Sequence, residues 1–117
     1  MVNAEHQAEA GRYDSLEIKN IVRGLKFKDE ELFVFDGLEN NIFLFDEEHS
    51  NGKTIRFCRS NELSGYDFHI LKSLPTKEKE QLLFSGILEA YLSRYIGAPA
   101  AQEVARSEAE KAYGKHQ

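Results

Sequence analysis

The sequence contains one cysteine, two prolines, no tryptophan and no long apolar run. A single cysteine cannot form an internal disulfide, which is typical of proteins from a reducing compartment. No stretch approaches the roughly 20 apolar residues that a membrane-spanning helix needs. The first residues show neither the basic start nor the apolar run of a secretory signal. These absences predict a cytoplasmic protein that does not enter a membrane.

Sequence motifs for common chemistry are absent as well. The scattered glycines form no GxGxxG or GxxxxGK[ST] phosphate-binding loop. There is no CxxC, HExxH or DxDxDG spacing for a metal ion. The run Asp46-Glu47-Glu48-His49 offers ligand-type side chains, but neighbours on a strand point to opposite faces and would not converge. The sequence therefore predicts no catalytic residue, no cofactor and no metal site.

What is present fits one small globular domain. The chain has 117 residues, of which 41% are hydrophobic and 30% charged, and its net charge is −5. A chain of this length and composition can form a buried core without disulfide bonds or other cross-links. We predict a single α+β domain over residues 14–97. It lies between a flexible arm, 1–13, and a polar tail, 98–117, that is either helical or disordered.

Two segments rich in aromatic and branched residues, 32–36 and 42–46, predict the two strands of a β-hairpin. The turn-forming residues glycine and asparagine lie between them. A turn-forming stretch and an alternating segment at 54–58 predict a third strand beside the second. In the favoured register, Asp46 faces Arg56 across the ladder. The pattern predicts an antiparallel β-meander of three to four strands.

The clearest helical period covers residues 83–96, with Thr76 as the expected N-cap and Gly97 as the expected end. This segment predicts one long C-terminal amphipathic helix packed against the sheet. Residues 15–24 favour a short N-terminal helix, although a strand is the alternative. Residues 68–74 fit either a fourth strand or a helix.

The first two strands are apolar on both faces, whereas a half-solvated sheet alternates apolar and polar residues. Along each strand one alternating set is aromatic and the other aliphatic: Phe33, Phe35, Phe43 and Phe45 against Leu32, Val34, Ile42 and Leu44. Something must therefore cover the second face. The alternatives are the helix at 15–24, a partner protein, or a second copy in a homodimer.

Acidic residues are concentrated between positions 29 and 48, where eight occur without a basic residue. An acidic surface attracts a basic partner, and an apolar patch beside it adds affinity. We therefore expect a non-catalytic protein-binding module, a regulator or an inhibitor, whose surface could also imitate the charge of a nucleic acid. The expected partner-binding residues are Asp36, Glu39, Asp46, Glu47 and Glu48.

Two other functions remain as alternatives. Cys58 and His69 could serve as a thiol nucleophile and its base in a small enzyme or ligand-binding domain. Lys53, Arg56 and Arg59 lie near aromatic residues and could contact a nucleic acid. The net negative charge argues against nucleic-acid binding, since phosphate contacts favour a basic surface.

Overall fold

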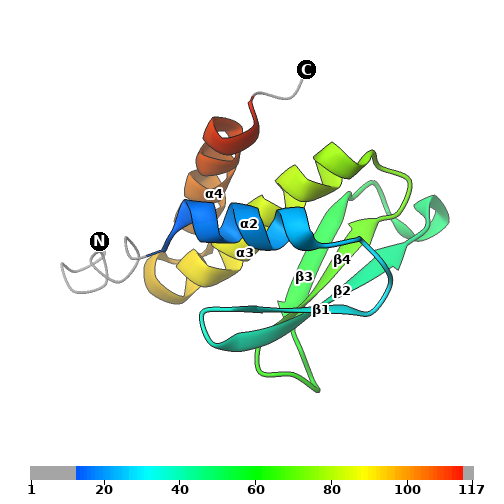
Figure 1. Ribbon diagram of the computed structural model, residues 1–117, viewed down its shortest axis with the longest axis horizontal. Coiled ribbons are helices and arrows are strands. Elements are labelled where there is room, and N and C mark those ends of the chain that lie inside the picture. Colours follow the sequence, from blue (N-terminus) through cyan, green and yellow to red (C-terminus); the bar gives the residue numbers. More distant parts are fainter. Residues whose placement is uncertain (1–12, 115–117) are drawn as a thin grey trace.

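A computed structural model describes residues 13–114 as two layers, a four-stranded sheet and three helices on one side of it (Figure 1). The predicted α+β class is confirmed. The arm predicted at 1–13 lies outside the described residues, apart from Tyr13. Within the described range, no helix combines the length and apolar composition needed to span a bilayer.

The sheet consists of β1 (Glu31–Phe35), β2 (Leu38–Phe45), β3 (Ile55–Arg59) and β4 (Tyr66–Leu71), in the spatial order β1-β2-β4-β3. The predicted antiparallel meander is wrong, because β4 lies between β2 and β3 and runs parallel to β2. Burial explains the order. β4 is the more apolar strand and lies in the centre of the sheet. β3, whose last residues are exposed, lies at the edge.

The crossover also removes the predicted contact between Asp46 and Arg56. Arg56 pairs with His69 of β4 instead. Its guanidinium lies 4.6 Å from the centre of the Phe45 ring. The short segment between β2 and β3 forms a 3-10 turn, Glu47–His49, rather than the tip of a hairpin.

The predicted hairpin between the first two strands is confirmed, but its turn is shorter than expected. Phe35 pairs with Leu38, so the turn contains only Asp36 and Gly37, with φ angles of 54° and 73°. Two positive φ angles are typical of the type I′ turn, which Asp-Gly favours. Residues 40 and 41, which the sequence reading places in the loop, therefore belong to β2.

Residues 15–24 form a helix, α2 (Ser15–Gly24), rather than a strand. The Asp14 carboxylate accepts a hydrogen bond from the backbone N–H of Leu16 at 2.9 Å, which caps the helix. Residues Ile18 and Val22 on one side of α2 are fully buried. They join the common core beside the long helix, so α2 lies in the helical layer.

The long helix, α3 (Thr76–Ile96), ends before Gly97 as predicted, while Thr76 is its first residue instead of its cap. The segment predicted as a polar tail supplies α4 (Ala98–Tyr113), and residues 115–117 lie outside the described range. Small side chains let α4 approach α3 closely. The buried ones follow a helical period: Ala101, Ala105 and Ala109.

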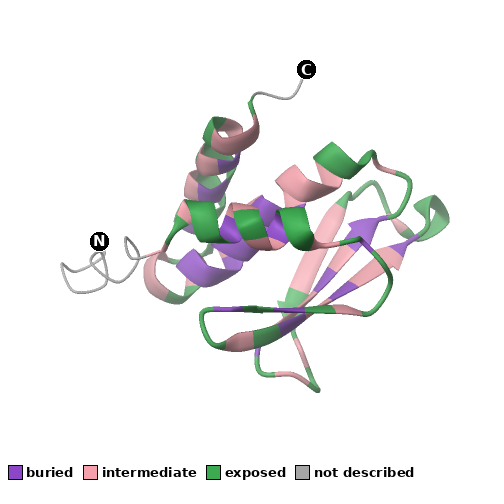
Figure 2. Ribbon diagram, in the orientation of Figure 1, coloured by how far each residue is buried: buried purple, intermediate pink, exposed green. Residues whose placement is uncertain are grey.

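The core lies between the helices and the sheet, where buried residues concentrate (Figure 2). Gly86 lies where α3 packs closely against the sheet. A Cβ at this position would lie 3.0 Å from Cδ1 of Ile55 and 3.4 Å from Cε1 of Phe68. The glycine inside the helix thus has a packing reason that offsets its low helix propensity.

A buried asparagine joins β2 to the start of β4. The Oδ1 atom of Asn40 accepts from the backbone N–H of Tyr66 at 2.9 Å, and its Nδ2 donates to the carbonyl of Leu38 at 3.0 Å. The asparagine side chain replaces a ladder hydrogen bond where parallel pairing begins. Gly65 packs against it so closely that a Cβ would meet Asn40 Oδ1 at 2.3 Å.

Candidate functional site: the open face of the sheet

One face of the sheet carries no helix, because α2, α3 and α4 all lie on the other side (Figure 1). Of the three alternatives for covering the second face, the helix at 15–24 is therefore excluded. We call the uncovered surface the open face. It is formed by side chains that alternate with the core residues: Leu32, Val34, Glu39, Asn41, Phe43, Phe45, Arg56, Cys58, Asp67, His69 and Leu71.

The apolar part of the open face lies on the edge strand β1. Leu32 is 59% exposed and Val34 is 60% exposed, although both belong to an uninterrupted apolar run over residues 32–35. Their neighbours Phe33 and Phe35 point into the core. These two neighbouring aliphatic side chains therefore expose apolar area to water, which is unfavourable.

Aromatic side chains occupy the centre of the open face. The rings of Phe43 and His69 stack with centroids 5.1 Å apart and an interplanar angle of 19°. Phe33 and Phe43 lie on opposite faces, because the two-residue turn pairs Phe33 with Asn40. The aromatic residues of the two strands are therefore divided between the core and the open face, a separation that strand alternation alone does not reveal.

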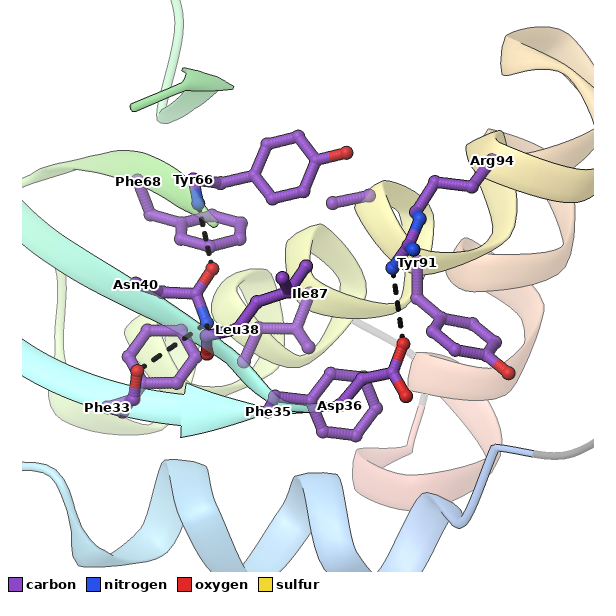
Figure 3. Close-up of a pocket in the computed structure, with 11 residues that line it drawn as sticks. Phe33, Phe35, Asp36, Leu38, Asn40, Tyr66, Phe68, Ile87, Tyr91 and Arg94 are labelled. Carbon is purple, nitrogen blue, oxygen red and sulfur yellow. Dashed lines mark hydrogen bonds and ion pairs between the residues drawn. The ribbon is translucent and has the colours of Figure 1, made fainter. Parts of the chain in front are cut away.

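The five predicted acidic residues do not form one patch. Glu39 is exposed on the open face, whereas Asp36 lies in the turn and pairs with Arg94 of α3 at 3.2 Å (Figure 3). The other three, Asp46, Glu47 and Glu48, follow the opposite end of β2, roughly 25 Å away for an eight-residue strand. The structure thus gives two separate acidic sites at the ends of the sheet.

The second acidic site brings together side chains that were expected to diverge. Possible ligand atoms of Asp46, Glu48 and His49 all lie within 4.8 Å of one another. They converge because these residues form a 3-10 turn instead of extending a strand. All three side chains are exposed, and Glu47 instead accepts a hydrogen bond from Ser73 at 2.8 Å. An exposed acidic turn is not by itself a metal site, and we assign none.

Cys58 and His69, the candidate nucleophile and base, both lie on the open face. Their strands are adjacent, and the two residues are diagonal neighbours two positions apart, since Arg56 pairs with His69 and Cys58 with Asp67. A shallow hollow of about 300 Å³ lies over them. Within residues 13–114 no hydrogen bond joins the thiol to the imidazole, the contact on which base activation depends.

The candidate nucleic-acid surface is divided between two faces. Arg56 lies on the open face over Phe45, whereas Arg59 lies on the helical side with its guanidinium 5.5 Å from the Tyr66 ring centre. The open face also carries the acidic residues Glu39 and Asp67. The described residues therefore do not gather these cations into the basic groove that nucleic-acid backbones require.

Near the turn between β1 and β2, the space between the sheet and α3 is almost filled. The hollow beside Asp36 and Arg94 has a volume of about 20 Å³, enough for about one water molecule (Figure 3). Its walls are core side chains such as Phe35 and Tyr91, whose rings are 5.8 Å apart. This hollow is too small for a substrate.

Comparison with known proteins identifies no relative. No protein-family model, no curated protein sequence and no solved structure matches this chain.

Proposed function

We propose that this chain is a non-catalytic protein-binding module whose open face docks on another protein. The observation that carries the proposal is the pair of aliphatic side chains on β1, Leu32 and Val34, each about 60% exposed on a face without a helix. Burying such a surface against a partner is favourable by about 25 cal/mol for each Å² of apolar area. The stacked rings of Phe43 and His69 extend the same surface.

Charge at the rim supports a basic partner. Glu39 is exposed beside the apolar pair, and Asp46 and Glu48 are exposed at the far end of β2. Acidic rim residues raise the rate of encounter with a basic surface and add little affinity of their own. The partner in this proposal is therefore a protein with a basic rim around an apolar centre. Imitation of nucleic-acid charge and a regulatory or inhibitory role belong to the same proposal.

The test compares proteins captured by the wild-type chain with those captured by a double variant, Leu32→Thr with Val34→Thr. Threonine keeps the strand propensity and removes apolar area. The matched control is Leu16→Gln, because Leu16 is 63% exposed on α2 and lies away from the open face. We expect specific partners to be lost by the double variant and retained by the control. If all three chains capture the same proteins, the open face is not the docking surface.

The contribution of the acidic rim residues to partner binding is tested separately. Asp46→Asn with Glu48→Gln removes rim charge without disturbing Glu47, which is bonded to Ser73. We expect slower association with the partner, a weaker dependence on salt and an unchanged dissociation rate. Equal association rates for this variant and the wild type would refute a role for the second acidic site. Asp36 is left intact because it pairs with Arg94.

A further inference from the structure

A groove runs along the outer edge of β3, between that strand and the helices. It consists of two adjoining hollows of about 530 and 620 Å³, which share Leu82 and Ser85 of α3. β3 forms one wall through Ile55 and Phe57, and α4 forms the other through residues such as Arg106. We call this the β3 groove. It opens on the helical side of the sheet, away from the open face.

The backbone of β3 has unpaired hydrogen-bonding groups along this groove. The N–H of Leu71 bonds to the carbonyl of Thr54, and the N–H of Ser60 bonds to the carbonyl of Gly65, both at 2.9 Å. In an antiparallel pair such bonds involve every second residue. The N–H and C=O groups of Ile55, Phe57 and Arg59 therefore point outward, where a further strand can accept and donate hydrogen bonds.

The groove floor is apolar where an added strand would insert side chains. Ile55 and Phe57 are half-buried and lie beside Leu82 and Gly86. The hollow of about 530 Å³ beside these residues leaves open space next to the apolar floor. An extended segment pairing with β3 would direct every second side chain into this space.

Glu89 gives the groove a preference for a cationic side chain. Its carboxylate lines the hollow next to β3 and, within residues 13–114, makes no hydrogen bond or ion pair. Partial burial raises the pKa of the Glu89 carboxyl above its ordinary value. A carboxylate that has lost part of its hydration and gained no partner is stabilised when a cationic group approaches it.

We propose that the β3 groove binds an extended segment of a partner protein, which adds to β3 as a fifth strand and places a lysine or arginine against Glu89. The free backbone of β3 requires an extended chain, and the apolar floor accepts alternate aliphatic side chains. The unpaired carboxylate selects the cation. This surface is separate from the open face, so it stands independently of the function proposed above.

The test selects binders from a displayed library of random ten-residue linear peptides against the full chain. We expect enriched peptides to alternate aliphatic residues with one lysine or arginine. A synthetic peptide of the enriched sequence should bind Glu89→Gln about tenfold more weakly than wild type. The control, Glu103→Gln, removes an exposed acidic residue of α4 outside the groove and should bind as wild type does. The open-face variants at Leu32 and Val34 should also leave peptide binding unchanged.

A second variant tests the strand pairing itself. Arg59→Pro removes an outward N–H from the edge strand without removing a bond to β4, a position where proline is tolerated. We expect it to weaken peptide binding, and we expect peptide to slow amide hydrogen exchange at Ile55 and Phe57. Should Arg59→Pro fail to fold, Glu89→Gln and the exchange data still decide the question.

Several outcomes would overturn the proposal. One is a library that yields no enriched peptide. Another is a set of peptides that bind Glu89→Gln and Arg59→Pro as tightly as wild type. A helical bound peptide would exclude strand addition. Finally, a dimer in sedimentation velocity that Arg59→Pro dissolves would show that a second copy occupies the edge.

Discussion

Replacing Asn40 with alanine removes the polar link between β2 and β4. Asn40 is only 4% exposed. Its side chain holds the N–H of Tyr66 at 2.9 Å and the carbonyl of Leu38 at 3.0 Å, with a longer contact of 3.5 Å to the carbonyl of Phe33. After Asn40→Ala, these backbone groups keep their positions and lose their partner.

The magnitude follows from the two short hydrogen bonds. A buried backbone group left without a partner costs about 1–3 kcal/mol. Tyr66 and Leu38 are half-buried, so the lower half of this range applies to each. We expect Asn40→Ala to lower the free energy of unfolding by about 3 kcal/mol. For a domain of this size, that loss lowers Tm by about 12 °C.

The assay is urea unfolding followed by circular dichroism, with the neighbouring Asn41→Ala as matched control. Asn41 has the same side chain one position along β2 and points to the opposite face. Its Oδ1 atom is buried without a hydrogen-bond partner in the described residues. We expect the control to change the free energy of unfolding by less than about 1 kcal/mol. Equal losses for the two variants would refute the role assigned to Asn40.

Three further outcomes follow from the structure. Gly65→Ala should destabilise the fold by more than about 2 kcal/mol in the same urea assay, because its Cβ would meet Asn40 Oδ1 at 2.3 Å and the Glu39 carbonyl at 2.6 Å; a neutral effect would contradict this packing. Glu89→Gln should raise the free energy of unfolding at pH 7. The raised pKa of the folded carboxyl disfavours the charged state, so the gain should vanish as the pH falls below the ordinary glutamate pKa; a gain independent of pH would refute the burial argument. Cys58 is exposed on the open face, so a thiol reagent should modify it in the native protein nearly as fast as in urea, and slow native labelling would contradict its placement.

The class of the fold and several of its elements could be predicted from the amino-acid sequence. Helical periodicity and Gly97 defined the end of α3, and the apolar period over residues 15–24 favoured the helix α2. The first hairpin was also predictable, since its two strands carry a local pattern and a turn lies between them. These features depend on contacts between residues close in the chain, which local propensity and periodicity describe.

The order of the strands was decided only by the tertiary structure. β3 follows β2 in the chain, yet β4 takes the central position because its buried side chains need neighbours on both edges. The pairing of β2 with β4 joins segments that no local pattern connects. Asn40 and Gly65 stabilise that junction, although the sequence pattern placed Asn40 in the first turn and did not indicate its contact with Gly65.

For the candidate sites too, some features were predictable from the sequence and others became visible only in the structure. The sequence indicated a surplus of apolar surface, because two strands were apolar on both faces. It could not indicate that α2 would join the helical layer and leave that surface uncovered, since this depends on how Ile18 and Val22 pack. The acidic run likewise became two sites when β2 separated its ends. Glu89 gained a role only when α3 was placed beside the free edge of β3.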